Sequence, residues 1–187
     1  MARDAGERMK WTLRKLVPDD TEACVALRRE MLLDEPAAFS SSPESDRGSD
    51  PALVRARLSQ TGRDATFGVF APALVGTVGV MMEPHPKASH RVWVWGMYVQ
   101  PAFRRRGIGR ALMEAVLSHA RSLSGVTQVN LSASATMPAA QALYRAVGFR
   151  VWGEEPRAMR LDGRYLGEVH MLCVLEHAGP EALRDRQ

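Results

Sequence analysis

The chain has 187 residues, of which 45% are hydrophobic and 25% are charged, and its formal net charge at pH 7 is +4. This is the composition of a globular domain, which excludes a fibrous protein and an intrinsically disordered one. The basic residues are scattered and almost all are arginine. A nucleic-acid-binding protein more often has a basic stripe interleaved with aromatic residues, so no nucleic-acid partner is expected.

A single domain that stays in the cytoplasm is the next expectation. Residues 1–10 are polar and charged and lack the apolar core of a signal peptide. The longest largely apolar run, residues 69–82, is shorter than the roughly 20 residues of a membrane span, so no membrane partner is expected. We expect flexible ends at residues 1–10 and 177–187 and one domain over residues 11–176.

The cysteines predict neither a metal site nor a disulfide. Cys24 and Cys173 are the only two, and neither has a neighbour at metal-ligand spacing. They are expected to be buried free thiols in a reducing cytosol.

Apolar periodicity and turn residues predict both helices and strands. In the first half we expect a strand at 11–16, a helix from Asp19 or Asp20 to about residue 33, a helix opened by Asp50-Pro51, and strands at 65–71, 74–83 and 91–99. In the second half we expect a helix starting at glycines 107–109, a strand at 128–133, a helix at 138–147 ended by Gly148, and strands at 150–161 and 165–175 around Asp162-Gly163.

The connections between these elements predict a mixed sheet. A helix joins the strands at 91–99 and 128–133, so these two strands are predicted to be parallel. The strands before them follow one another through short turns and are predicted to pair antiparallel.

The segment Arg104-Arg105-Arg106-Gly107-Ile108-Gly109 lies where one strand is predicted to end and a helix to begin. A helix start leaves several backbone N–H groups unpaired and carries a partial positive charge, which together attract an anion. Glycine lets a bulky anion approach the backbone closely. The segment therefore predicts a phosphate-binding turn.

Two motifs resemble those of the GNAT family of acyl-CoA-dependent N-acetyltransferases. Arg104, Gly107 and Gly109 match the family's pyrophosphate-binding pattern of Gln or Arg, two residues, Gly, one residue, and Gly or Ala. Residues 137–149 resemble its Asn-x-x-Ala-x-x-Leu-Tyr-x-x-x-Gly-Phe helix. Similarity to a bacterial subgroup of the family extends to residues 34–39 and 155–171, so the resemblance covers about residues 11–176.

The resemblance implies an α/β fold with a mixed α+β sheet of about seven strands and helices on both faces. It implies acetyl-CoA as co-substrate, with the pyrophosphate over the backbone amides of residues 105–110 and the pantetheine arm along the strand edge at 97–99. The implied cofactor-binding residues are Met97, Tyr98, Val99, Arg104, Arg105, Arg106, Gly107, Ile108, Gly109 and Arg110. Tyr144 is the implied general acid that protonates the departing thiolate of CoA. The N-terminal helices and the last hairpin are implied to line the acceptor pocket.

One departure from the family pattern concerns the cofactor. Met137 stands where the family helix usually opens with a cofactor-contacting Asn. Ser134 or Thr136 would offer a hydroxyl in its place.

A second departure concerns the general base. Trp93 stands where several protein-acetylating relatives carry a glutamate, and the alternating positions after it, Trp95, Met97 and Val99, are apolar too. No carboxylate is therefore expected on that side of the strand. The base stays open between a water relay and the residues expected to border the same end of the sheet, Glu83, His85 and His90.

These observations predict an acetyl-CoA-dependent N-acetyltransferase that acts on a primary amine of a small molecule. The alternatives are a protein or peptide amine as acceptor and, because of Met137 and the missing glutamate, a non-catalytic acyl-CoA-binding module. A P-loop hydrolase is excluded because no Gly-x-x-x-x-Gly-Lys-Ser/Thr motif occurs. A dinucleotide-binding fold is disfavoured because Leu112 stands where a third glycine is expected. The sequence leaves the acceptor and the oligomeric state open, a homodimer included.

Overall fold

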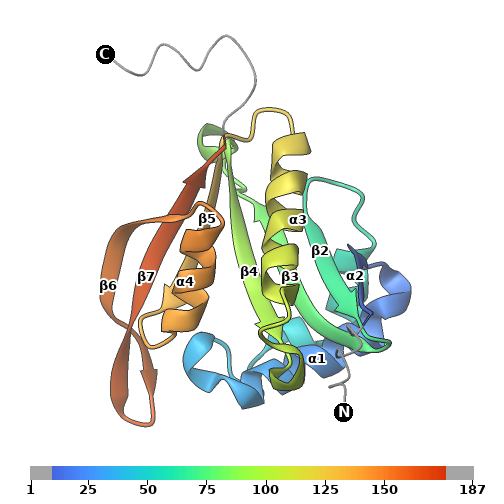
Figure 1. Ribbon diagram of the computed structural model, residues 1–187, viewed down its shortest axis with the longest axis horizontal. Coiled ribbons are helices and arrows are strands. Elements are labelled where there is room, and N and C mark those ends of the chain that lie inside the picture. Colours follow the sequence, from blue (N-terminus) through green and yellow to red (C-terminus); the bar gives the residue numbers. More distant parts are fainter. Residues whose placement is uncertain (1–9, 176–187) are drawn as a thin grey trace, which may run out of the picture.

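The computed structural model describes residues 10–175. The flexible ends expected at residues 1–10 and 177–187 therefore lie outside the described residues, apart from residue 10. The described chain folds around one seven-stranded sheet with the strand order β1-β2-β3-β4-β5-β7-β6. Helices α3 and α4 cover one face of this sheet, and α1 lies on the other (Figure 1). The predicted fold class is thereby confirmed.

The predicted helices and strands are all present. The strands are β1 (Thr12–Lys15), β2 (Ala65–Phe70), β3 (Leu74–Met82), β4 (Arg91–Val99), β5 (Gln128–Ser134), β6 (Arg150–Leu161) and β7 (Arg164–Val174). The α-helices are α1 (Thr21–Asp34), α2 (Pro51–Leu58), α3 (Ile108–Ser122) and α4 (Pro138–Ala146), and the short 3₁₀ turn η2 (Pro36–Ala38) follows α1. As predicted, β4 and β5 are parallel, and β1 to β4 pair antiparallel.

Each face of the sheet has its own hydrophobic core. On the α3 side, Leu112 and Val116 are fully buried, as the helical spacing predicted. On the α1 side, Met31 and Val54 bring α1 and α2 together in a second, smaller core. The sheet therefore lies between two layers of helices, and side chains from both faces can line any cavity that passes through it.

The two N-terminal helices begin differently. At α2 the Asp50 carboxylate accepts hydrogen bonds from Ala52 N at 2.8 Å and Leu53 N at 3.4 Å, which is the expected cap. At α1 the expected side-chain cap is absent. Asp20 occupies the N-cap position, but its carboxylate accepts hydrogen bonds from the Arg14 guanidinium at 2.6 and 2.7 Å. The bidentate ion pair competes successfully with the cap because both its partners are charged.

The C-terminal end of α4 follows the sequence prediction. Gly148 has a φ of +101°, a conformation that glycine adopts without strain. Phe149 N donates to Tyr144 O at 3.0 Å, and Gly148 N donates to Arg145 O at 3.1 Å. This pattern satisfies carbonyls of the last helical turn and fixes the direction of the chain after α4.

Strand β4 separates from β5 halfway along its length. The two strands pair only from Arg91 to Trp93, and further on the β5-facing edge of β4 has no strand partner among residues 10–175. A bulge at Gly96, which has a φ of +59°, shifts the register with β3. The expected alternation is therefore wrong beyond Trp95, because the bulge turns Met97 to the other face of the sheet.

Candidate functional site

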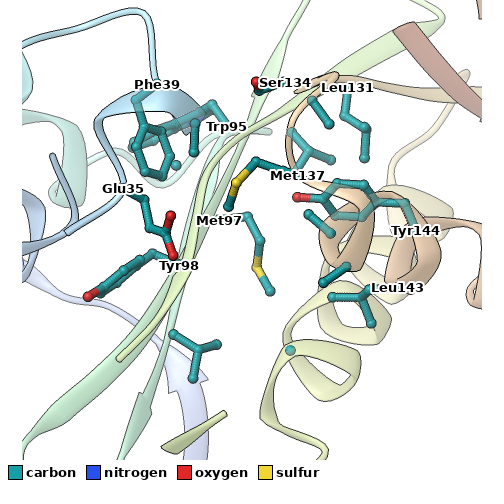
Figure 2. Close-up of a pocket in the computed structure, with 18 of the residues that line it drawn as sticks. Glu35, Phe39, Trp95, Met97, Tyr98, Leu131, Ser134, Met137, Leu143 and Tyr144 are labelled. Atoms are coloured by element: carbon teal, nitrogen blue, oxygen red, sulfur yellow. The ribbon is translucent and has the colours of Figure 1, made fainter. Parts of the chain in front are cut away.

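A cavity of about 760 Å³ lies where β4 and β5 diverge. Figure 2 shows Tyr144, Leu143 and Met137 on one side of β4 and Phe39, Trp95 and Glu35 on the other. The cavity thus passes through the sheet and is lined from both faces. Such volumes are typical of sites for small molecules and cofactors.

The mouth of α3 opens into this cavity without a cap. Gly107 occupies the N-cap position with a φ of +80° and offers no side chain to the helix. Going along the chain from Arg105, Ala111 is the first residue whose backbone N–H donates to another residue of the protein; it bonds Gly107 O at 3.0 Å. No acceptor within residues 10–175 satisfies the N–H groups of residues 105–110. These six donors and the helix dipole form an anion site.

The second glycine of the turn keeps the passage between α3 and α4 open. A Cβ atom at Gly109 would lie 3.1 Å from Leu143 Cδ2 and 3.3 Å from Met97 Cε. Both distances are tighter than ordinary van der Waals contact, so the neighbours would have to move. Met97, predicted to contact the cofactor, lines the cavity at this passage.

The predicted arginines of the turn have different surroundings. Arg104 donates to Val99 O at 2.8 Å, Glu35 Oε1 at 2.9 Å and Asp34 Oδ2 at 2.7 Å. It therefore ties the turn to the end of α1. Arg110 bonds Glu114 through Nε at 2.8 Å, which leaves its two Nη groups available.

Arg105 and Arg106 form the part of the turn whose side chains carry no internal contact. Within the described part of the chain neither makes a hydrogen bond or an ion pair. Arg105 has a φ of +62°, an uncommon conformation that costs energy outside glycine. The turn thus holds two free guanidinium groups next to unpaired backbone donors, which is suited to a di-anionic ligand.

The hydroxyl of Tyr144 points into the cavity (Figure 2). The side chain is 7% exposed and packs its ring against Phe149 at a centroid distance of 6.1 Å. No described residue makes a hydrogen bond with the hydroxyl, and burial raises its pKa to about 12. At neutral pH this phenol is protonated and can donate to whatever occupies the cavity.

The Tyr98 side chain contacts α1 on the opposite face of the sheet from α3. Its hydroxyl lies 3.1 Å from Asp34 Oδ2 and 3.2 Å from Glu30 Oε1 on α1. Burial and these two carboxylates raise the pKa of the phenol. The side chain therefore belongs to the packing of α1 on the sheet, and only the backbone of Tyr98 remains to meet a ligand from the α3 side.

The start of α4 satisfies part of its own polar groups. The Ser134 hydroxyl lies 2.9 Å from that of Thr136, and Gln141 Nε2 donates to Ser134 O at 3.2 Å. Met137 occupies the N-cap position of α4 and lines the cavity. The two hydroxyls that could replace an Asn side chain are thus already paired with each other.

The three predicted base candidates lie away from the cavity. Glu83 accepts a hydrogen bond from Trp93 Nε1 at 3.0 Å and faces Arg91 at 3.6 Å. His85 and His90 lie at the same end of β4 as Arg91, and none of the three residues lines the cavity. A strand rises about 3.3 Å per residue, so the six residues from Arg91 to Met97 span about 20 Å. These residues border one end of the sheet, as expected, but that end lies away from the cavity, so the structure does not favour any of them as the base.

Glu35 and Glu168 are two carboxylates that line the cavity but were not among the predicted site residues. Glu35 is paired with Arg104. Glu168 lies on β7 opposite Ser134 of β5 and has no cationic partner among the described residues. Both belong to segments that carry the family resemblance, which was the only signal in the sequence that could have found them.

Glu168 has two titratable neighbours. One ligand atom each from Glu155, Glu168 and His170 lies within 4.8 Å of the others. His170 Nε2 lies 3.3 Å from Glu155 Oε2, and the His170 ring packs at a tilt of 33° against Trp152, with a centroid distance of 5.3 Å. Glu168 is thus the member of the group that reaches the cavity wall.

None of the helices within residues 10–175 has the length and apolar character that crossing a bilayer requires.

Comparison with known proteins gives one consistent family. Residues 26–149 match the family model described as Acetyltransferase (GNAT) family. The chain is 32% identical to N-alpha-acetyltransferase RimI from Mycobacterium tuberculosis over 157 residues, which cover 81% of this chain and 86% of that protein. It is 31% identical to mycothiol acetyltransferase from Segniliparus rotundus over 137 residues, 70% of this chain and 51% of that protein.

Other curated relatives are also longer than the matched part. The chain spans 45% of N-acetyltransferase 8 from Homo sapiens. Among solved structures, a putative acetyltransferase from Salmonella typhimurium with its cofactor acetyl-CoA aligns with a TM-score of 0.77 and 22% identity, covering 92% of this chain and 98% of that chain. An acetyltransferase of the GNAT family from Streptococcus pneumoniae aligns with a TM-score of 0.80 and 16% identity, covering 89% of this chain and 100% of that chain.

Proposed function

The chain belongs to the GNAT family of acetyltransferases, and from this premise we propose that it moves the acetyl group of acetyl-CoA to a primary amine of a small molecule. The observation that carries the proposal is the uncapped mouth of α3. Six backbone N–H groups without an internal acceptor open on the same cavity as the unpaired hydroxyl of Tyr144. One ligand with a pyrophosphate and a thioester can engage both.

The pyrophosphate binds the N–H groups of residues 105–110. Arg105, Arg106 and the Nη groups of Arg110 supply charge-assisted hydrogen bonds to its oxygens. Arg104 holds the turn in place through its contacts with Val99, Asp34 and Glu35. The pantetheine arm follows the open edge of β4 at Met97–Val99, and a β4 amide stabilises the oxyanion that forms on the thioester carbonyl.

The transfer is a direct attack by the amine on the thioester. The nitrogen bonds to the carbonyl carbon as the carbon–sulfur bond breaks, and the sulfur takes the phenol proton of Tyr144. The second proton of the attacking nitrogen then restores the phenol. Positioned proton transfer of this kind contributes roughly 10²- to 10⁴-fold to a rate.

Glu168 accepts the proton that the ammonium form of the acceptor loses before attack. It is the carboxylate of the cavity wall that no described cation neutralises, whereas Glu35 is paired with Arg104 at 2.9 Å. An unpaired carboxylate also attracts an ammonium group and so positions it. In this chain the base comes from β7 instead of β4, where Trp93 occupies the corresponding position.

A peptide amine is the second candidate acceptor. The relative RimI is by its name an N-alpha-acetyltransferase, and an α-amine has a reference pKa near 8, which eases the loss of its proton. The non-catalytic acyl-CoA-binding module is the third candidate, because Met137 replaces the expected Asn.

A thiol-release assay separates the three candidates. The full chain is mixed with acetyl-CoA and a panel of small primary amines and N-terminal peptides, and free CoA is followed with a thiol reagent. We expect CoA release that depends on a small amine. Release with peptides alone would establish the second candidate. Acetyl-CoA binding in calorimetry without acceptor-dependent release would establish the module, and no binding at all would overturn the assignment of the α3 mouth.

A further inference from the structure

A second cleft adjoins the transfer cavity on the α2 side of the sheet. Its volume is about 730 Å³, and Arg28, Ser41 and Trp95 line both hollows. A molecule whose amine lies in the transfer cavity can therefore extend past Trp95 into the second cleft.

The charges of this cleft do not balance. Its described lining contains four cationic side chains, Lys15, Arg28, Arg47 and Arg57, and two carboxylates, Asp46 and Asp64. Arg28 and Asp46 neutralise each other through two hydrogen bonds of 2.9 and 2.8 Å. Asp64 accepts from Met82 N at 2.8 Å. Lys15, Arg47 and Arg57 have no carboxylate partner among residues 10–175, so the cleft carries an excess of positive charge.

Arg57 is held in the cleft by stacking instead of an ion pair. Its guanidinium carbon lies 4.5 Å from the centre of the Trp95 ring. Its Nε atom is buried and has no hydrogen-bond partner within the described chain. Burial raises the pKa of the neighbouring Cys24 thiol, and Arg57 opposes that effect. Because Nε is closed to solvent, a ligand in the cleft can reach only the Nη groups of this guanidinium.

The indole that carries Arg57 is itself fixed. A Cβ atom at Gly79 would lie 2.0 Å from the Trp95 ring, so the ring occupies the space that any other residue at position 79 would need. The stack of Gly79, Trp95 and Arg57 presents a preorganised guanidinium, which loses little conformational entropy when it binds a planar anion.

We propose that this cleft binds an anionic group of the acceptor, a carboxylate or a phosphate, and that Arg57 is its principal contact. The inference rests on the proposed transfer to a small amine. It defines the substrate class as amines that carry a negative charge at the end remote from the reacting nitrogen. A bidentate contact through the two Nη groups of Arg57 matches the planar guanidinium to two oxygens of a carboxylate or phosphate.

Matched acceptors test this assignment on the full chain. The first arm compares amino acids and short peptides with their carboxamides, which lack the carboxylate charge. The second compares phosphoethanolamine with ethanolamine, which lacks the phosphate. Both arms use saturating acetyl-CoA. We expect kcat/KM to be about tenfold or more higher for the anionic member of at least one pair. The arm that shows the preference identifies carboxylate or phosphate.

Variants assign the preference to Arg57. Arg57→Gln is expected to reduce it below about threefold, and Arg57→Lys to retain part of it, because lysine keeps the charge without the planar fork. Arg55→Gln, on the same helix but outside the cleft lining, is expected to keep the full preference. The KM for acetyl-CoA checks that the donor site of each variant is intact.

The outcomes distinguish the two proposals. Equal rates for acids and amides, or a preference that survives Arg57→Gln, would overturn the anionic subsite and leave the transferase function standing. Absence of CoA release with every amine of both arms would overturn the transferase function itself, and the subsite with it.

Discussion

The donor side and the acceptor side of the cavity are built in different ways. The proposed donor side comes from one short segment, residues 104–110, and consists mostly of backbone N–H groups that the fold leaves unpaired. The proposed acceptor side combines side chains from separate parts of the chain: Glu35 after α1, Trp95 of β4, Arg57 of α2 and Glu168 of β7. A backbone site survives sequence change as long as its turn forms, whereas a side-chain site can change its ligand with one substitution.

Tyr144 lies where the two sides meet, so its removal is expected to have the largest effect. Tyr144→Phe deletes the phenol proton while keeping the ring on Phe149, and kcat is expected to fall by about 100-fold or more, with little change in acetyl-CoA affinity. Steady-state thiol release and calorimetry measure the two quantities.

The matched control for Tyr144 is Tyr165→Phe, because Tyr165 is 56% exposed and lies outside the cavity lining. It is expected to leave kcat unchanged. Full turnover in Tyr144→Phe would make the phenol a packing residue and would remove the chemical link between the two sides.

Glu168 tests whether the acceptor side supplies the base. Glu168→Gln keeps the size and removes the charge, and kcat/KM for the amine is expected to fall about 10- to 100-fold, with the KM for acetyl-CoA unaffected. Glu154→Gln on β6 is the control, since Glu154 is exposed and does not line the cavity. An unchanged kcat/KM in Glu168→Gln would assign proton removal to water.

The same contrast accounts for what the sequence could and could not predict. The turn at Arg104–Gly109 and the end of α4 at Gly148 follow from local rules about glycine and helix ends, and their geometry is confirmed. The faces of β4 do not follow from local rules. The bulge at Gly96 reverses the alternation after Trp95, and alternation alone cannot reveal an extra residue.

Contacts set by the packing of strands and helices account for the other differences between prediction and structure. Asp20 has the residue type of a helix cap, but Arg14 on β1 takes its carboxylate. Glu83 and the two histidines were candidate bases because they border one end of the sheet, and the cavity lies toward the other end of β4. Glu168 reaches the cavity because β7 inserts between β5 and β6, an order that no local pattern specifies.

Two glycines with the same backbone conformation, Gly107 and Gly125, allow a controlled test of the proposed donor site. Gly107 has a φ of +80° and Gly125 a φ of +77°, and a Cβ atom at either would meet nothing within 4 Å. Gly107→Ala and Gly125→Ala are therefore expected to lower the free energy of unfolding equally, by about 1 kcal/mol. Thermal or denaturant unfolding measures this.

Acetyl-CoA binding is expected to separate these two variants. Gly107→Ala strains the turn that presents the N–H groups, so the Kd for acetyl-CoA is expected to rise about tenfold, whereas Gly125→Ala lies at the other end of α3 and is expected to leave it unchanged. An equal Kd in both variants would mean that the α3 mouth is not the pyrophosphate site.

The smallest expected effect concerns the wall of the acceptor side. Asp46 accepts hydrogen bonds from Arg28 and from Ser49, and Arg28 holds the pKa of this carboxyl well below its usual range. Because the folded pKa lies below the unfolded value near 3.9, the pair stabilises the fold above about pH 4, and this contribution is lost as the pH falls further.

Asp46→Asn is expected to lower the melting temperature by a few degrees at pH 7 and by less at pH 3. Asp19→Asn, at an exposed carboxylate, is the control that should show no such trend. If the difference in melting temperature between wild type and Asp46→Asn is the same at pH 7 and pH 3, then the charge of Asp46 does not stabilise this part of the cleft. The acceptor side would then depend on its side-chain ion pairs less than the comparison with the donor side implies.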